Sequence, residues 1–314
     1  MPSMTRRLAL ALFAGTATYG AMWYYKRNRG RSKAQALFAK PLTPPQGALN
    51  VFHLGHSLVG RDMPAMVAQL AGADHQYHSQ LGWGTSLREH WEPDQPINGF
   101  DEENDHPHFR SAKEALETGT YDVVVLTEMV EIRDAVRYHN SAKYLALWAG
   151  HAWDANPNSR IYLYETWHHT NDASGWLARI DTDLPKYWQE SVMYPALANT
   201  DAPIHLIPAG QVMAAFVRAI HDVGGVDGIA TVEDLFALNP DGTQDTIHVN
   251  DLGAYIVALT HFAVLYHRSP VGLPYQLRRA DGSAAQAPGA QAAALMQKVV
   301  WQVIARYPET GVGS

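Results

Sequence analysis

The amino-acid sequence predicts an α/β domain with a mostly parallel sheet that helices cover on both faces. Short apolar runs typical of buried strands alternate with longer segments of helical spacing between residues 48 and 266. The run YDVVVLTEM, residues 121–129, is rich in β-branched residues and is the clearest expected strand. Strands that alternate with helices favour a parallel sheet between two helical layers. The chain has 314 residues, 46% of them apolar, which is enough for one large domain.

The alternation can be followed element by element. Five strands are expected, at residues 48–55, 75–84, 121–129, 159–167 and 202–210. Helices are expected at residues 62–73, 111–119, 141–156, 175–199, 211–223 and 251–266. Pro185 lies inside the fourth of these helices and predicts a break or kink there. A last helix at residues 290–307 follows a connector of low hydrophobicity, QLRRADGSAAQAPGAQ, and is expected to pack back on the body.

The amino terminus contains LALALFAGTATYGAMWYY, residues 8–25, a run of 18 residues without a charge. As a helix this run would span roughly 27 Å, close to the ~30 Å hydrocarbon core of a bilayer. Arg6 and Arg7 precede it and KRNRGR follows it, so a membrane anchor and a cleaved signal peptide both fit. The anchor is favoured because no small-x-small cleavage site lies just after the run. An apolar first helix packed on the domain is the third interpretation.

These patterns divide the chain into four regions. Residues 1–38 are expected to form the membrane anchor or signal segment, and the Pro-rich residues 39–48 an extended linker. Residues 49–270 would form the α/β domain, and residues 271–314 the connector and C-terminal helix. The anchor predicts a membrane-bound protein with its domain outside the cytoplasm, although the Lys and Arg that follow the run favour the inner side.

Charge is distributed unevenly along the chain. Residues 1–48 hold eight Lys or Arg and no acidic residue, which leaves 16 basic and 31 acidic side chains in the remainder, a net charge of −15. A body this acidic is a poor nucleic-acid binder, because phosphate contacts need clustered Lys and Arg. The absence of cysteine from the sequence excludes disulfides, thiolate nucleophiles and cysteine-based metal sites.

A first chemically suggestive motif is LGHSL, which follows the first expected strand. It places Ser57 in a Gly turn, where its hydroxyl would be exposed near helix amides at the carboxyl end of the sheet. Taken alone, Ser57 is more simply an N-cap of the next helix.

A second motif, DTIHVND, precedes the long apolar helix at residues 251–266. Asp245 and His248 are three residues apart, a spacing at which an aspartate in a turn can orient a histidine base. Taken alone, this pair is a surface turn, with Asn250 or Asp251 as the helix cap.

Together, GHSL near the start of the domain and DTIH before its last long helix resemble the first and last sequence blocks of the SGNH (GDSL-type) hydrolase superfamily. The resemblance covers about residues 49–268 and implies a flavodoxin-like three-layer α/β/α fold. It also implies that Ser57 is a nucleophile, that His248 is its general base and that Asp245 orients the base. It implies no cofactor.

The middle blocks of the superfamily match less well. The resemblance implies an oxyanion hole made by the Ser57 amide, a glycine after the second strand and an asparagine after the third. Gly82 in QLGWGTS is the first choice for the glycine and Gly84 the alternative, although both could merely permit a turn. The usual GxND block is absent, and the third strand ends in Thr127 and Glu128.

This ending more closely resembles an uncharacterised branch of the superfamily. That branch has a Gln-Glu pair after the third strand and a Thr-Trp pair after the next one, which Thr166 and Trp167 match. Thr127 could donate its hydroxyl where the family has an amide. Glu128 would have to be protonated, or hydrogen-bonded elsewhere, to avoid repelling an oxyanion.

Glu128 and several other residues are candidates for substrate contact. His56 stands where the family usually has Asp or Asn, and a buried structural histidine is the favoured interpretation. The loop YETWHHTND follows the fourth strand and could bring Trp167 and His168 to the site. Trp83 and Trp91 are further candidates for stacking on a sugar, although core or rim packing explains each tryptophan at least as well.

The 16 histidines raise the question of a metal site. Several lie close together in the sequence, but none has HExxH spacing or forms a helical i, i+4 histidine pair (His75 and His78, His106 and His108, His168 and His169). The segment DEENDHPH, residues 101–108, is expected to be a solvated acidic loop. We therefore expect no metal.

The sequence as a whole predicts a serine ester hydrolase that acts on a small acyl ester, with an O-acetylated carbohydrate as the suggested substrate. The carbohydrate rests on the resemblance and on the aromatic loops. Two alternatives stay open. One is an O-acyltransferase with the same triad, and the other is a non-catalytic glycan-binding module tethered to the membrane.

Overall fold

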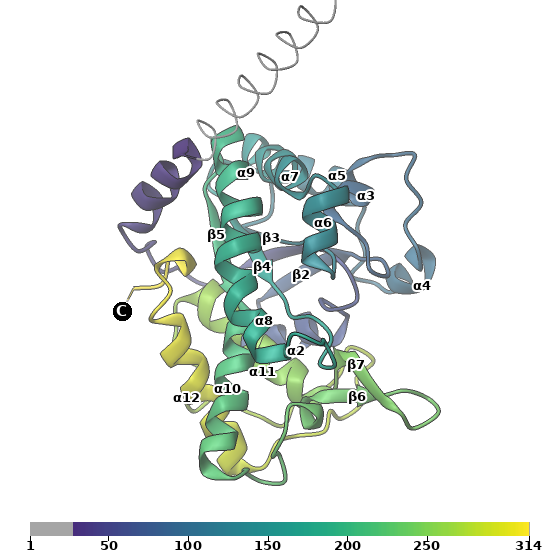
Figure 1. Cartoon of the computed structure of the whole chain (residues 1–314). Helices are drawn as coiled ribbons and strands as arrows, with labels where there is room; N and C mark the ends of the chain where they lie inside the picture. The colour runs from purple at the N-terminus through teal and green to yellow at the C-terminus, as the bar shows by residue number, and fades with distance from the viewer. Residues whose placement is uncertain (1–27, 314) are drawn as a thin grey trace, which may run out of the picture.

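The computed structural model describes residues 28–313 and contains a five-stranded parallel sheet (Figure 1). The strand order is β2-β1-β3-β4-β5, and every neighbouring pair is parallel. The bounds are Asn50–Leu54 (β1), Gln76–Gln80 (β2), Val123–Thr127 (β3), Arg160–Glu165 (β4) and Ile204–Pro208 (β5). All five lie within the strands expected from the sequence. The chain places β2 on one side of β1 and then β3, β4 and β5 on the other, so the strand order reverses between β1 and β3. Ligands of doubly wound sheets bind at such a switch point.

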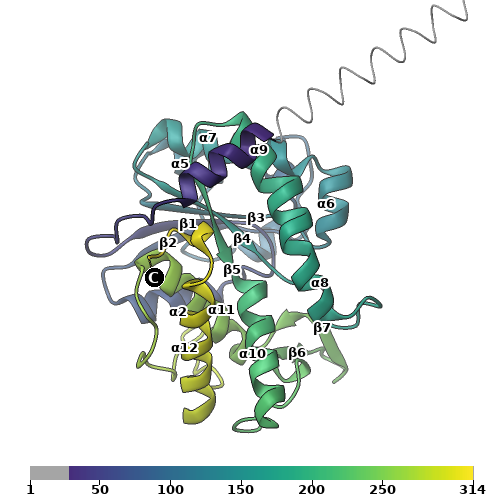
Figure 2. The same cartoon turned by 60° about the vertical axis from the view of Figure 1, so that its left-hand side comes forward.

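Helices cover both faces of the sheet, and each face has its own hydrophobic core. One layer contains α2 (Asp62–Ala71), α8 (Trp176–Asp183), α10 (Ala209–Val223), α11 (Asp251–Tyr266) and α12 (Ala290–Ile304). The other contains α3 (Leu87–Trp91), α5 (Ala112–Glu117), α6 (Ile132–Tyr138), α7 (Ser141–Ala155) and α9 (Tyr194–Asn199). Figure 2 shows α12 running beside α10 and α11. This arrangement confirms the predicted parallel α/β architecture.

The segment expected as one helix at residues 175–199 changes its winding instead. Between α8 and α9 the chain forms a π-helical stretch, Leu184–Met193, with Pro185 near its start. Proline has no N–H to donate, so it is tolerated where one type of helix gives way to another. The expected break is therefore a change of helix type without a turn.

The N-terminal run at residues 8–25 lies outside the described residues. Between residues 28 and 313, no helix combines the length and apolar character needed to cross a membrane. Residues 28–38, predicted as the end of the anchor segment, form a helix whose Ala34 is buried in the second core. Lys33 Nζ donates to the Thr200 carbonyl at 2.8 Å, beside α9. In the predicted linker, the Leu42 N–H donates to the Gly311 carbonyl at 2.8 Å, so this segment runs along the body.

Several short elements were not expected. The acidic segment contains a helix, α4 (Phe100–Asn104), and a small antiparallel sheet pairs β6 (Phe236–Leu238) with β7 (Gln244–Val249). The short helices α3 and α6 were not expected either, nor were two 3₁₀ turns, Glu233–Leu235 and Pro308–Thr310. Each of these elements is too short to show a hydrophobic period in the sequence.

Candidate active site

Ser57 lies just beyond the carboxyl end of β1, in a turn closed by the Val59 N–H donating to the His56 carbonyl at 2.8 Å. The next helix, α2, begins at Asp62, and its N-cap is Arg61. Ser57 therefore does not cap α2, which removes the simpler interpretation of this serine. Its position beside β3 is the switch point of the sheet, where a side chain can meet residues from several elements.

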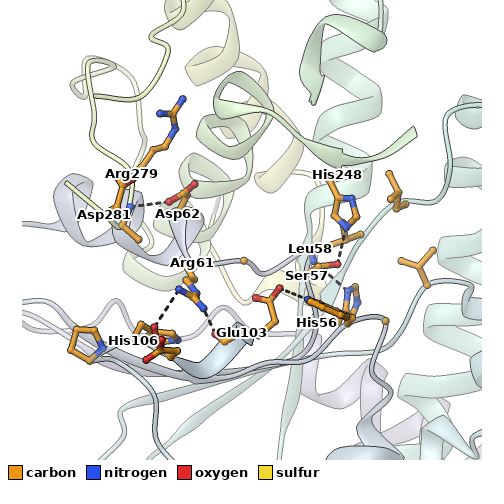
Figure 3. A pocket seen from close by; sticks show the side chains of 18 of the residues that line it. His56, Ser57, Leu58, Arg61, Asp62, Glu103, His106, His248, Arg279 and Asp281 are labelled. Carbon is orange, nitrogen blue, oxygen red and sulfur yellow. Dashed lines mark hydrogen bonds between the residues drawn. The ribbon is translucent and has the colours of Figure 1, made fainter. Parts of the chain in front are cut away.

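Ser57, His248 and Asp245 form a continuous hydrogen-bonded line (Figure 3). His248 Nδ1 lies 2.8 Å from Asp245 Oδ2, and His248 Nε2 lies 3.0 Å from Ser57 Oγ. A carboxylate can only accept, so it fixes the proton on Nδ1 and leaves Nε2 free to accept from the serine. The fold thus brings together the residues that the sequence predicted as a triad, although Ser57 and His248 lie 191 positions apart in the chain.

Asp245 is held in place by the backbone of its own strand. Its Oδ1 accepts the N–H groups of Ile247 at 2.8 Å and of His248 at 3.0 Å. Burial alone would raise the pKa of Asp245, but these hydrogen bonds and the His248 side chain lower it below its ordinary value. The carboxylate is therefore ionised wherever the histidine can act as a base. The pair lies on β7 and not in the turn that the spacing predicted.

The loop after β4 fixes β7 by three hydrogen bonds. Trp167 Nε1 donates to the Ile247 carbonyl at 2.8 Å, and the Thr170 N–H donates to the Thr246 carbonyl at 2.8 Å. His169 Nδ1 lies 2.7 Å from Thr246 Oγ1. These contacts join the main sheet to the strand that carries His248.

His56 is a structural histidine that shapes the serine turn. Its Nε2 lies 2.9 Å from the Glu128 carbonyl, and its Nδ1 lies 3.4 Å from the Leu58 N–H. Because the Leu58 amide can only donate, Nδ1 accepts, and the protonated Nε2 donates a hydrogen bond to the Glu128 carbonyl. Burial lowers the pKa of His56 to about 4, so the ring is neutral at physiological pH. The favoured sequence interpretation of a buried structural residue agrees with this placement, although one edge of the ring borders the cavity described below.

A second buried histidine, His90, supports the same turn from α3. The Gln80 carbonyl oxygen accepts the Ala112 N–H at 2.8 Å, so the Gln80 amide donates to His90 Nδ1 at 3.0 Å. His90 Nε2 is then protonated and donates to the Gly55 carbonyl at 2.7 Å. Its spacing from Gln80 carries no signal for this role.

Thr127 and Glu128 do not face the serine. Thr127 is fully buried and its hydroxyl donates to the Tyr164 carbonyl at 2.8 Å. Glu128 is also fully buried, and its Oε1 accepts the N–H groups of Leu87 at 3.2 Å and Met129 at 2.8 Å. Burial raises the pKa of Glu128 to about 7. Both residues therefore belong to the scaffold behind the site, and Thr127 is not positioned as an oxyanion donor.

The loop after β2 places Gly84, and not Gly82, on the cavity wall. Gly82 is buried, and a Cβ added there would lie 2.3 Å from both the Ile97 side chain and Thr85 Oγ1. Gly84 has a φ of +57° and open space around it. The glycine ranked second from the sequence is the one that borders the site.

Ser57 and His248 open into a cavity of about 1010 Å³, at the upper end of the range for ligand sites. Its walls come from the serine turn, the loop after β2, the α4 segment, the loop after β4 and the distant connector (among them Arg61, Trp83, Glu103, His106, His169, Arg279 and Asp281). Figure 3 shows Arg61 reaching across to the α4 segment, where its Nε donates to the Glu103 carbonyl at 3.3 Å. The predicted acidic loop is thus part of the site.

The three candidate tryptophans differ in their exposure and in whether they line the cavity. Trp83 is 52% exposed and lines the cavity, with its Nε1 donating to Glu103 Oε1 at 2.8 Å. Trp167 is buried, and Trp91 packs edge-to-face on Trp148. His168 is also buried away from the cavity, and burial followed by the nearby Arg179 lowers its pKa to about 4. Of these candidates for a sugar-binding wall, Trp83 is the one in position.

Histidines that suggested a metal site make hydrogen bonds or ring contacts with neighbouring side chains. His75 Nδ1 lies 2.7 Å from the Tyr266 hydroxyl, and His108 stacks on Tyr77. Across residues 28–313, no group of three or more His, Asp or Glu side chains is arranged to hold a metal ion.

A doubly wound parallel sheet, a serine after its first strand and an Asp–His pair facing that serine form the arrangement that the SGNH resemblance implies. Three solved structures are similar to this chain. A carbohydrate esterase family 3 protein from Talaromyces cellulolyticus is 14% identical, with a TM-score of 0.39, and the match covers 69% of this chain and 96% of that one. A GDSL-like lipase from Parabacteroides merdae is 16% identical, with a TM-score of 0.40, over 68% of this chain and 94% of that one.

The third similar structure is a gut microbial diltiazem-metabolizing enzyme, 12% identical, with a TM-score of 0.39, over 80% of this chain and 54% of that one. No family model and no curated protein matches the chain. Likeness at this level of identity and TM-score carries no weight for the reaction, which has to be inferred from the site itself.

Proposed function

We propose that the protein is a serine ester hydrolase of the SGNH type. The single observation that carries this proposal is the line from Ser57 Oγ to His248 Nε2 at 3.0 Å and from His248 Nδ1 to Asp245 Oδ2 at 2.8 Å. A nucleophile, a base within hydrogen-bonding reach and a group that orients the base together define acyl-transfer catalysis. The line opens into a cavity large enough for a substrate.

The reaction follows from this geometry. His248 Nε2 takes the proton of Ser57 as the hydroxyl oxygen attacks the ester carbonyl carbon, and Asp245 stabilises the imidazolium that forms. Main-chain N–H groups of Ser57 and Gly84 are the proposed oxyanion donors. The imidazolium then protonates the departing alcohol. In the second half, water gives a proton to His248 and attacks the acyl-serine, which releases the acid and restores Ser57.

We infer that the alcohol part of the substrate is a carbohydrate. Trp83 offers an exposed ring on the cavity wall, and its hydrogen bond to Glu103 limits rotation of that ring. A fixed aromatic face beside carboxylates suits a sugar, which has apolar C–H faces and hydroxyls at its edge. Glu103 Oε1 accepts the hydrogen bond from Trp83. Asp105 and Arg61 also border the cavity, where the sugar hydroxyls would lie.

Hydrolysis is favoured over transfer to a second glycan. An acyltransferase must keep water from its acyl-enzyme, whereas the His248 side chain is 47% exposed at the mouth of a broad cavity. Water can therefore reach the base that has to activate it. A non-catalytic binding module would have no need for the tautomer that Asp245 imposes on His248.

The test combines labelling with turnover. We expect a fluorophosphonate probe to label the wild-type protein, and we expect Ser57→Ala to abolish both labelling and hydrolysis of p-nitrophenyl acetate. Ser174→Ala is the matched control, because Ser174 is exposed and lies outside the cavity. Unchanged labelling or turnover in Ser57→Ala would contradict the proposal. Added glycan acceptors should give no acylated product.

A further inference from the structure

Arg179 of α8 is only 1% exposed and binds three carboxylates from different parts of the chain. Its Nη1 donates to Glu131 Oε2 at 2.6 Å and to Asp172 Oδ2 at 2.7 Å. Its Nη2 donates to Glu131 Oε1 at 2.8 Å, and its Nε donates to Asp183 Oδ2 at 2.9 Å. A buried guanidinium with several fixed partners holds the segments that it joins in one relative position. These four residues are called the Arg179 clamp below.

Two residues of the clamp are close in the chain to the wall of the substrate cavity. Glu131 directly follows Val130, and Asp172 lies three residues after His169. Val130 and His169 both line the cavity into which the proposed nucleophile opens. The first belongs to the segment after β3 and the second to the loop after β4. The clamp therefore joins two segments that form part of the cavity wall.

Helix α8 holds the loop after β4 at two points. Trp176 Nε1 donates to the His168 carbonyl at 3.1 Å, and Arg179, three residues further along α8, donates to Asp172. Asp172 Oδ1 also accepts the Ser174 N–H at 2.8 Å. The hydrogen bonds from Arg179 and then from Ser174 lower the pKa of Asp172 to about 2, so this carboxylate is ionised at physiological pH.

The same loop contacts β7 through the three hydrogen bonds to Thr246 and Ile247 described above. Figure 1 and Figure 2 both show this loop between β7 and the start of α8. Thr246 and Ile247 directly precede His248, whose Nε2 lies 3.0 Å from Ser57 Oγ. A displacement of the loop would therefore move the proposed base relative to the nucleophile.

We propose that Arg179 is a positioning residue for His248 and acts through Asp172 and the loop after β4. This inference rests on the proposed ester hydrolase function. Arg179 is not among the residues that line the cavity, so its effect is on the alignment of the base and not on contact with the substrate. A misplaced base slows proton transfer, whereas a small ester can still bind. The role therefore predicts a loss of kcat at nearly constant KM.

Asp172→Ala tests the role, because it removes the contact between the clamp and the loop and leaves Arg179 bound to Glu131 and Asp183. We expect kcat for p-nitrophenyl acetate to fall about tenfold and KM to change by less than about twofold. Asp172→Asn should retain part of the lost kcat, since its amide oxygen can still accept one hydrogen bond. Arg179→Met should lower kcat at least as far, and Asp172→Ala covers the case in which that variant does not fold.

A double variant separates positioning from a merely structural role. Trp167→Phe breaks the same connection at its other end, because Trp167 donates to the Ile247 carbonyl. If the loop transmits the effect, Asp172→Ala combined with Trp167→Phe should lower kcat by less than the product of the two single factors. A merely structural clamp would lower the free energy of unfolding and leave kcat of the folded protein unchanged.

Asp181→Ala is the matched control. Asp181 also lies on α8 and pairs with Arg218 at 2.7 Å, but both side chains of this pair are exposed. The control should keep the kcat of the wild-type protein. An unchanged kcat in folded Asp172→Ala would overturn the positioning role, as would single factors that multiply in the double variant. These results leave the hydrolase intact. A wild-type protein that hydrolyses no ester and resists fluorophosphonate overturns the proposed function and the positioning role with it.

Discussion

His56 Nε2 lies 2.9 Å from the main-chain oxygen of Glu128, so the residue before Ser57 is bonded to the residue that follows β3. This bond joins the chain just after β1 to the chain just after β3, the two neighbouring parallel strands at which the strand order reverses. The serine turn is thereby held at the switch point of the sheet. A histidine at this position serves the shape of the turn, because both of its ring nitrogens are engaged with the backbone.

Replacing His56 tests that scaffold role. His56→Ala leaves the buried Glu128 carbonyl without its donor, so we expect a loss of about 1–3 kcal/mol in the free energy of unfolding. We also expect slower fluorophosphonate labelling of Ser57. His56→Gln, whose amide nitrogen can occupy the place of Nε2, should restore much of both quantities. Urea unfolding and labelling kinetics provide the measurements, and equal behaviour of the two variants would contradict the role.

Asp245→Asn tests the orientation of the base. An amide at position 245 could donate to His248 Nδ1 and favour the tautomer with its proton on Nε2, which cannot accept from Ser57. We expect kcat for p-nitrophenyl acetate to fall roughly 10³- to 10⁴-fold with little change in KM. Steady-state kinetics measure the effect. A loss below tenfold would show that His248 does not depend on Asp245.

Trp83 and Trp167 should respond oppositely to substitution. Trp83→Ala removes the exposed wall, so we expect KM for an acetylated oligosaccharide to rise about threefold to tenfold while kcat for p-nitrophenyl acetate changes little. Trp167→Phe removes the donor to the Ile247 carbonyl beside His248. We expect that variant to lower kcat for both substrates and to leave the ratio of their KM values as it is. The reverse pattern would make Trp167 the sugar-binding residue.

The sheet and the proximity of Ser57, His248 and Asp245 could be predicted from the sequence because their signals are local. Strands β1, β3, β4 and β5 are largely apolar, and β2 (QYHSQ) is an alternating segment. Ser57, Asp245 and His248 stand in short motifs of recognisable type. By contrast, α4, β6 and β7 have only three to six residues each, so no periodicity marked them. Their placement depends on tertiary contacts.

The remaining site residues could not be predicted for the same reason. Arg279 borders the cavity because Asp251, 28 residues earlier, accepts two of its N–H groups. Trp83 faces the cavity and Trp167 does not, although both follow strands and both are tryptophans. Such choices depend on the partner that each side chain finds after folding, and residue type alone carries no information about that partner.

The buried carboxyl of Glu165 predicts how stability depends on pH. Glu165 is fully buried at the end of β4, and its Oε1 accepts Gln211 Nε2 at 3.3 Å. Burial raises its pKa to about 8, so the folded protein keeps a proton that the unfolded chain releases near pH 4.5. The stabilisation by the protonated Glu165 carboxyl is fully present below pH 4.5 and is lost as pH rises through 8. The free energy of unfolding falls by at most about 1.4 kcal/mol for each pH unit in this range.

Buried histidines change stability in the opposite sense at lower pH. Burial lowers the pKa of His56 and His90 to about 4. The unfolded chain therefore takes up protons that the folded protein does not, and the folded protein loses stability as pH falls from 6.5 towards 4. Between pH 6.5 and 8 the carboxyls therefore dominate, with Glu128 acting in the same direction through its pKa of about 7. We expect the free energy of unfolding to decrease across this range in the wild-type protein.

Glu165→Gln should flatten this decrease, because an amide keeps the hydrogen-bonding shape and does not ionise. Urea unfolding at pH 6.5, 7.5 and 8.5 measures the slope, and Glu114→Gln is the control, since Glu114 is exposed on α5. The control should retain the slope of the wild-type protein. If Glu165→Gln retains it as well, the loss of stability between pH 6.5 and 8 has to be assigned to Glu128, and Glu128→Gln should then remove it.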